Sequence, residues 1–208
     1  MKASGIVLAG GRSSRMGRDK ALLSVDSETL IERTVKELRK SVDEIIIASN
    51  NQCKYNIPDT LEVPDIFTDM GPLGGIHAGL LAANHPYAFV VAADMPFFSA
   101  DLAADFLKRC QGYDVVVPFI KGKWEPLCAI YSRNCLKPIE QALKNDINKV
   151  VRIFPDVKVL KVSEEELARM GSKKQLFCNL NTPEDYVQLF PGQEDLTELA
   201  KQRPVHKK

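Results

Sequence analysis

Net charge, long apolar runs and closely spaced cysteines are all scarce in this sequence of 208 residues. Lysine and arginine total 28 against 27 aspartate and glutamate, so the formal net charge is only +1. A general nucleic-acid binder carries a clear basic excess, and we therefore expect no nucleic-acid partner. The hydrophobic content of 45% is high enough to bury a core, which excludes an acidic disordered protein.

Apolar runs long enough to cross a membrane are absent. Runs such as Ala88–Ala93 are far too short to span a bilayer, so we expect no membrane partner. Residues 1–5 lead directly into a strand-like run and lack the apolar region and cleavage pattern of a signal peptide.

The five cysteines are scattered and form no Cys-x-x-Cys pair. Their arrangement excludes a familiar zinc spacing and argues against a disulfide framework. We interpret most of them as small core residues in a protein with a reducing, cytoplasmic location. They are Cys53, Cys110, Cys128, Cys135 and Cys178.

Short β-branched runs alternate along the chain with longer amphipathic segments. Several runs are apolar throughout, as in strands that are buried on both faces. The alternation predicts an α/β fold, namely a three-layer α/β/α sandwich with a mainly parallel, Rossmann-like sheet. The predicted strands are Gly5–Leu8, Glu44–Ala48, Thr60–Val63, Ala88–Ala93, Asp114–Pro118, Leu127–Tyr131 and Lys158–Val162. The predicted helices are Glu28–Lys40, Leu73–Asn84, Ala100–Cys110, Asn134–Lys144 and Thr182–Phe190.

The sequence shows no internal repeat, no low-complexity block and no long linker. At this length we expect a single domain, which we assign to residues 1–190. From Pro191 onward the sequence turns polar and then basic, and residues 191–208 are predicted to form a C-terminal tail.

The most informative segment follows the first predicted strand. Gly10 and Gly11 are followed by four basic residues and one acidic residue up to Lys20, a local charge of +3. Ligands of open α/β sheets bind at the carboxyl ends of the strands, where glycines let backbone N–H groups approach phosphate oxygens and cations balance their charge. We interpret the segment as an anion-binding loop; the alternative is a glycine-rich turn with solvated charges. It is neither a Walker loop nor Gly-x-Gly-x-x-Gly.

Polar residues also follow two later strands and precede the last predicted helix. Asp65 comes before Gly-Pro-Leu-Gly-Gly at 71–75, and Asp94 ends the apolar run at 88–93. Asn179 and Asn181 project to the same side of an extended segment. The structural alternatives are a turn cap for Asp65, a cap of the next helix for Asp94, and an Asx turn with a helix cap for the asparagines.

Together these motifs resemble those of a known family. Leu8-Ala9-Gly10-Gly11-x3-Arg15-Met16-Gly17-x2-Lys20 resembles the signature loop of nucleotidyltransferases that activate small phosphorylated molecules. Glycine at position 10 makes this loop similar to that of the molybdenum cofactor guanylyltransferases in particular. The three later segments align in the same order, so the resemblance spans roughly residues 5–190 and implies the nucleotide-diphospho-sugar transferase type of fold.

This resemblance implies transfer of GMP from GTP to molybdenum-bound molybdopterin (Mo-molybdopterin), with release of pyrophosphate. Molybdoenzymes and other cofactor-biosynthesis proteins are further implied partners. Arg15 and Lys20 would be catalytic and neutralise the β- and γ-phosphates. The residues implied to cradle the nucleotide are Leu8, Ala9, Gly10, Gly11 and Lys20.

The same resemblance implies roles for the later polar residues. Asp94 matches the aspartate that binds Mg²⁺, a metal that prefers oxygen ligands and takes one or two carboxylates together with substrate phosphates. Asp65 would contact the nucleoside, where a carboxylate can accept hydrogen bonds from the ring N–H and exocyclic amine of guanine. Asn179 and Asn181 are assigned to the molybdopterin side.

Two alternative functions stay open on the sequence. The first is a molybdenum cofactor cytidylyltransferase or another nucleotidyltransferase that acts on a small-molecule phosphate. The second is a noncatalytic partner protein that binds GTP or molybdopterin. Asp94 together with Arg15 and Lys20 favours catalysis.

Overall fold

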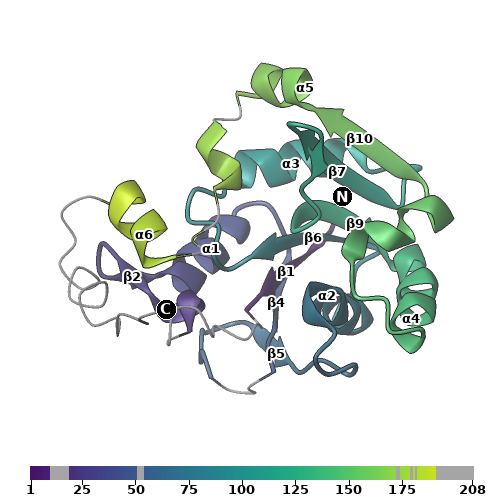
Figure 1. Ribbon diagram of the computed structural model, residues 1–208, viewed down its shortest axis with the longest axis horizontal. Coiled ribbons are helices and arrows are strands. Elements are labelled where there is room, and N and C mark those ends of the chain that lie inside the picture. The colour runs from purple at the N-terminus through teal and green to yellow at the C-terminus, as the bar shows by residue number, and fades with distance from the viewer. Residues whose placement is uncertain (10–18, 51–53, 172–173, 179, 181, 191–208) are drawn as a thin grey trace, which may run out of the picture.

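The computed structural model describes residues 1–9, 19–50, 54–171, 174–178, 180 and 182–190. Figure 1 shows a central sheet with helices packed on both of its faces. Among the described residues, no helix is both long and apolar enough to cross a membrane.

Eight strands of the described chain form the central sheet, in the order β10-β7-β9-β6-β1-β4-β5 with β8 paired to β7. The β1–β4, β1–β6, β4–β5 and β7–β10 pairs are parallel, and β9 is antiparallel to both β6 and β7. The strands are β1 (Ser4–Leu8), β4 (Glu44–Ala48), β5 (Leu61–Val63), β6 (Tyr87–Ala92), β7 (Val115–Ile120), β8 (Lys123–Trp124), β9 (Cys128–Ser132) and β10 (Val159–Ser163).

Helices cover the two faces of the sheet as separate layers (Figure 1). One layer contains α1 (Leu30–Leu38), α3 (Ala100–Arg109) and α5 (Glu164–Arg169), and the other contains α2 (Gly71–Ala82) and α4 (Leu136–Lys144). Short 3-10 turns lie at η1 (Lys20–Leu22), η2 (Arg133–Cys135), η3 (Val150–Asp156) and η4 (Lys174–Phe177), and the last described helix is α6 (Pro183–Leu189).

Alternate residues of each strand enter different cores because successive side chains of a strand point to opposite faces. In β1, Val7 packs with α1 and α3, whereas Ile6 and Leu8 pack with α2 and α4. Gly79 lets α2 approach closely, since a Cβ at this position would lie 2.6 Å from Ile6 Cγ2. The two cores confirm the predicted three-layer α/β/α sandwich.

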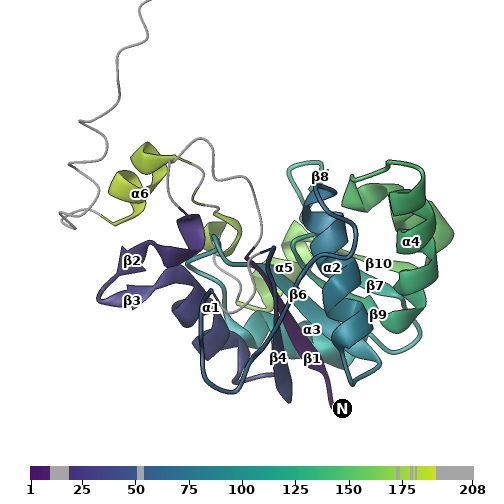
Figure 2. The same cartoon turned by 90° about the horizontal axis from the view of Figure 1, so that it is seen from below.

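A small apolar cluster stands apart from both main cores. The hairpin of β2 (Ser24–Val25) and β3 (Glu28–Thr29) contributes Val25, which packs with Leu30 and with Leu180 from near the end of the described chain. Figure 2 shows α6 lying beside this hairpin, away from α2 and α4.

All seven predicted strands are present with shifts of one residue at most boundaries. The helix predicted from Glu28 begins instead at Leu30, because Glu28–Thr29 pairs with Ser24–Val25 and Thr29 caps the helix in a capping box with Glu32. The elements α5 and β8 and the hairpin were not predicted from the sequence. Three cysteines, Cys110, Cys128 and Cys135, are buried, which confirms that most of the cysteines are core residues.

The carboxyl ends of four parallel strands meet at one edge of the sheet. Backbone hydrogen bonds extend the pairing beyond the strands: Ala9 N–H donates to Ala48 at 3.0 Å, Ser49 N–H to Val63 at 2.9 Å, and Ala93 N–H to Leu8 at 3.0 Å. The residues that follow β1, β4, β5 and β6 are therefore held close together. This edge is where an open α/β sheet binds its ligands.

Candidate active site

Asp94 and Lys20 form an ion pair at this edge. Lys20 begins the 3-10 turn η1, Asp94 follows β6, and Lys20 Nζ lies 3.6 Å from Asp94 Oδ2. Their side chains are 21% and 24% exposed. Burial raises the pKa of Asp94, while the charge of Lys20 acts in the opposite direction. The structure thus brings together two of the residues that the sequence analysis selected as catalytic.

The helix-cap alternative for Asp94 is excluded by the residue that caps α3. Ser99 is the N-cap, and its side chain accepts the Asp101 N–H at 3.2 Å. The carboxylate of Asp94 is not needed for this cap. This carboxylate instead forms the ion pair with Lys20.

The backbone of Asp94 also contacts the last part of the described chain. Leu180 N–H donates to the Asp94 carbonyl at 3.0 Å, and the Leu180 side chain is fully buried in the cluster with Leu23 and Val25. Asn179 and Asn181 flank Leu180 and lie outside the described residues. The segment that carries them nevertheless reaches Asp94 through Leu180.

Asp65 lies against the start of α2. Cβ atoms built on Gly74 and Gly75 would lie 3.5 Å from Asp65 Oδ2 and 3.6 Å from Oδ1, so the carboxylate is in van der Waals reach of both glycines. The side chain is half-buried, and its burial raises the pKa of Asp65. Within the described residues no side-chain hydrogen bond or ion pair engages this carboxylate, which speaks against the turn-cap alternative.

The structure describes the two ends of the candidate nucleotide loop. Leu8 is the buried last residue of β1 and Ala9 is half-buried behind it. Gly10, Gly11 and Arg15 lie outside the described residues, and their assignment stays a prediction. On the far side of the segment, Asp19 accepts the Ala21 N–H at 3.0 Å and caps η1.

Two residues of the connection between β4 and β5 contact these loop ends and were missed by the sequence analysis. Tyr55 Oη lies 2.9 Å from the Ala9 carbonyl oxygen and 2.8 Å from Asp19 Oδ2. Lys54 forms an ion pair with the same Asp19 oxygen. Their position in the sequence could have indicated this location, because Lys54 and Tyr55 follow a buried strand that ends at the same edge as β1.

The tryptophan of the chain packs within the sheet layer. This residue is Trp124. It lies in β8 and makes edge-to-face contacts with Phe119 and Phe154, with ring centroids 4.8 Å and 5.3 Å apart. Packing accounts for its position.

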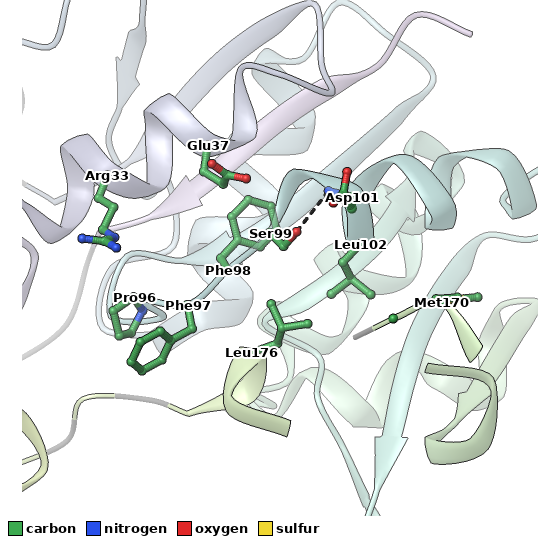
Figure 3. A pocket seen from close by; sticks show the side chains of 11 residues that line it. Arg33, Glu37, Pro96, Phe97, Phe98, Ser99, Asp101, Leu102, Met170 and Leu176 are labelled. Atoms are coloured by element: carbon green, nitrogen blue, oxygen red, sulfur yellow. Dashed lines mark hydrogen bonds between the residues drawn. The ribbon is translucent and has the colours of Figure 1, made fainter. Parts of the chain in front are cut away.

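A pocket of about 450 Å³ opens on the α1 and α3 side of the segment that follows Asp94. Figure 3 shows Arg33 and Glu37 extending from α1 toward it, and the hydrogen bond between Ser99 and Asp101 at its wall. Lys20, Asp65 and Asp94 are not among its lining residues, so it is distinct from the charged site. It is lined by Arg33, Glu37, Pro96, Phe97, Phe98, Ser99, Asp101, Leu102, Met170, Gly171 and Leu176.

The side chains of the site suit a cation that is bound jointly by a carboxylate and by the phosphates of a substrate. Among the described residues no group of three or more His, Cys, Asp or Glu side chains could hold a metal ion by itself. Mg²⁺ commonly takes one or two carboxylates, and substrate phosphates and water complete its shell. The largely buried carboxylate of Asp94 fits that requirement.

Comparisons with known proteins place this geometry among nucleotidyltransferases. Residues 5–159 match the MobA-like NTP transferase domain. The chain is 41% identical over 187 residues to a probable molybdenum cofactor guanylyltransferase of Pelotomaculum thermopropionicum, covering 90% of this chain and 91% of that protein. It is 36% identical over 184 residues to the molybdenum cofactor guanylyltransferase of Desulfosudis oleivorans, covering 88% and 91%.

A solved structure shows the same fold. The molybdopterin-guanine dinucleotide biosynthesis protein A from Archaeoglobus fulgidus superposes with a TM-score of 0.77 at 23% identity, covering 90% of this chain and 96% of that one. A cytidylyltransferase from Thermus thermophilus superposes with a TM-score of 0.68 at 18% identity. The fold is therefore shared by enzymes that differ in their nucleotide.

Proposed function

The chain belongs to the MobA-like NTP transferase family, and on that premise we propose that it transfers GMP from GTP to Mo-molybdopterin. An oxygen of the terminal phosphate of molybdopterin forms a bond to the α-phosphorus of GTP. The bond between that phosphorus and the oxygen bridging to the β-phosphate breaks, and pyrophosphate leaves. The product is molybdopterin guanine dinucleotide.

Positioning and charge stabilisation supply most of the catalysis in such a transfer, since the acceptor phosphate is itself the nucleophile. Lys20 carries a partly exposed ammonium group beside Asp94, a suitable place to neutralise the leaving pyrophosphate. The Lys20–Asp94 pair at the carboxyl edge, in a chain of this family, is the observation that carries the proposal. Gly10, Gly11 and Arg15 are proposed to bind the phosphates from the same side.

We further propose that Asp94 holds Mg²⁺ together with the phosphates of GTP. The carboxylate is largely buried and its one described cationic partner is Lys20 at 3.6 Å, so a bound cation would compensate the cost of its burial. When bound, Mg²⁺ supplies further charge neutralisation at the phosphate oxygens.

A nucleotide panel tests the function directly. Purified protein is incubated with Mg²⁺, molybdopterin and each of the four nucleoside triphosphates, and the released pyrophosphate is measured. We expect release with GTP. A preference for CTP would support the cytidylyltransferase alternative, and no release with any nucleotide would support a noncatalytic binding protein.

Asp65 is proposed to select guanine by accepting hydrogen bonds from its ring N–H and its amino group. The substitution Asp65→Asn replaces one acceptor oxygen with a donor and leaves a guanine donor unpaired. We expect kcat/KM for GTP to fall by roughly 10–100-fold. The ratio of kcat/KM for GTP to kcat/KM for ATP should therefore decrease. Steady-state kinetics with both nucleotides measures the change.

The matched control is Asp59→Asn in the exposed turn before β5, a residue with φ of 54° that asparagine also adopts. This variant should keep the native preference. An Asp65→Asn enzyme with unchanged GTP selectivity would show that Asp65 does not contact the base.

Asn179 and Asn181 are proposed to bind molybdopterin, and Leu180 between them already contacts Asp94. Delivery of the product to molybdoenzymes or other cofactor-biosynthesis proteins, and a cytoplasmic location, stay predictions.

A further inference from the structure

Tyr55 touches both residues that border the candidate nucleotide loop. Its hydroxyl is within hydrogen-bond distance of the Ala9 carbonyl at 2.9 Å and of Asp19 Oδ2 at 2.8 Å. Ala9 immediately precedes residues 10–18 and Asp19 immediately follows them. One side chain from the β4–β5 connection thus joins the two ends of the segment to which GTP phosphates are assigned.

The tyrosine is itself well anchored. Its backbone N–H donates to Glu62 Oε1 at 3.1 Å, and its ring packs against the core on the α1 and α3 side of the sheet. Burial raises the pKa of Tyr55, and hydrogen bonding to Asp19 raises it further. The phenol therefore keeps its single O–H proton at neutral pH, and it shares this proton between the two acceptors at the loop ends or donates it to one of them.

The contact leads directly to the charged pair of the site. Asp19 caps the turn η1, whose first residue is Lys20, and Lys20 pairs with Asp94. A hydrogen bond that fixes Asp19 therefore also fixes the backbone from which Lys20 extends. Lys54 adds an ion pair to the same Asp19 carboxylate.

We propose that Tyr55 is a positioning residue for GTP, whose hydroxyl joins Ala9 to Asp19 and so holds Lys20 in place for the phosphates. This inference rests on the proposed function, because GTP is the ligand that the positioned groups bind. Tyr55 acts through Asp19 and Lys20, and molybdopterin binding does not depend on it.

The test is Tyr55→Phe, which keeps the buried ring and removes the hydroxyl. Binding of GTP with Mg²⁺ is measured by titration calorimetry, and KM is measured for each substrate. We expect the Kd and KM for GTP to rise about tenfold, while KM for molybdopterin stays within about twofold. If Tyr55 had a purely structural role, Tyr55→Phe would lower Tm without raising the KM for GTP more than the KM for molybdopterin.

Two further variants complete the test. Tyr113→Phe is the matched control, because Tyr113 precedes β7 at the opposite edge of the sheet and should bind GTP normally. Asp19→Ala removes the side-chain acceptor and leaves the Ala9 carbonyl, so Tyr55→Phe should add less than its separate effect in the double variant. Fully additive effects would contradict action through Asp19.

The outcomes separate this inference from the proposed function. If native protein binds GTP and Tyr55→Phe binds it equally well, the positioning role is wrong and the proposed function stands. If native protein does not bind GTP in the presence of Mg²⁺, the proposed function is overturned together with the inference that rests on it.

Discussion

The substitution Asp94→Asn is expected to reduce kcat for pyrophosphate release by at least about a thousandfold. Asparagine has nearly the same shape but lacks the charge that holds a cation and faces Lys20 at 3.6 Å. Loss of several kcal/mol of charge stabilisation in the transition state corresponds to a rate loss of this order. Single-turnover kinetics at saturating Mg²⁺ and GTP measure the chemical step.

The matched control is Asp105→Asn, which removes an aspartate of α3 that pairs with an exposed lysine, Lys108, at 2.9 Å. Its activity should remain native. Circular dichroism and thermal unfolding should show that Asp94→Asn stays folded. Full turnover by the Asp94 variant would remove this residue from the catalytic assignment.

The same carboxylate predicts the acid limit of activity. Burial raises the pKa of Asp94, and Lys20 only partly offsets the effect. The carboxylate must be ionised to hold a cation, so activity should fall with decreasing pH at a higher pH than an exposed aspartate would give. A profile of kcat/KM for GTP against pH checks this, and raising Mg²⁺ should move the acid limb to lower pH.

The second large effect is on stability, from Phe89→Ala in the central strand β6. Phe89 is fully buried and contacts Phe98 and Phe106, with ring centroids 5.3 Å and 6.2 Å apart. Removing a buried phenyl ring costs its transfer free energy and leaves a cavity, about 3–5 kcal/mol in total. For a chain of this length we expect Tm to fall by about 10 °C, as measured by calorimetry.

Two comparisons bracket the expected loss of stability. Phe89→Leu keeps most of the apolar volume and should cost about 1 kcal/mol. Leu81→Ala changes an exposed residue of α2 and should stay within about 0.5 kcal/mol of native. A Phe89→Ala protein as stable as the Leu81 variant would contradict the packing described here.

The sheet could be predicted because its strands are short, apolar throughout and buried on both faces. Ile6, Val7 and Leu8 show this pattern, and each enters a core in the structure. The two-residue pair of β2 and β3 carries no such signal. It is stabilised by tertiary contacts of Val25 with Leu30 and Leu180, which local propensity does not contain.

The site could be predicted where a functional residue directly follows a buried strand. Asp94 and Asp65 satisfy that condition, and Lys20 was found from the charge of its loop. Tyr55 was not predicted, because a tyrosine in a connecting segment has no characteristic spacing. Its partners, Ala9 and Asp19, also lie far away in the sequence. Such contacts depend on which strands are neighbours.

The hydrogen bond from Leu180 to Asp94 has a consequence for biosynthesis. Ribosomes make the chain from its N-terminus, and the sheet strands from β1 to β10 all precede Leu180. A nascent chain can therefore pair its strands before the last polar segment reaches Asp94 or the hairpin cluster is closed. Closure of the contact between Leu180 and Asp94 is thus a later event in synthesis than formation of the sheet.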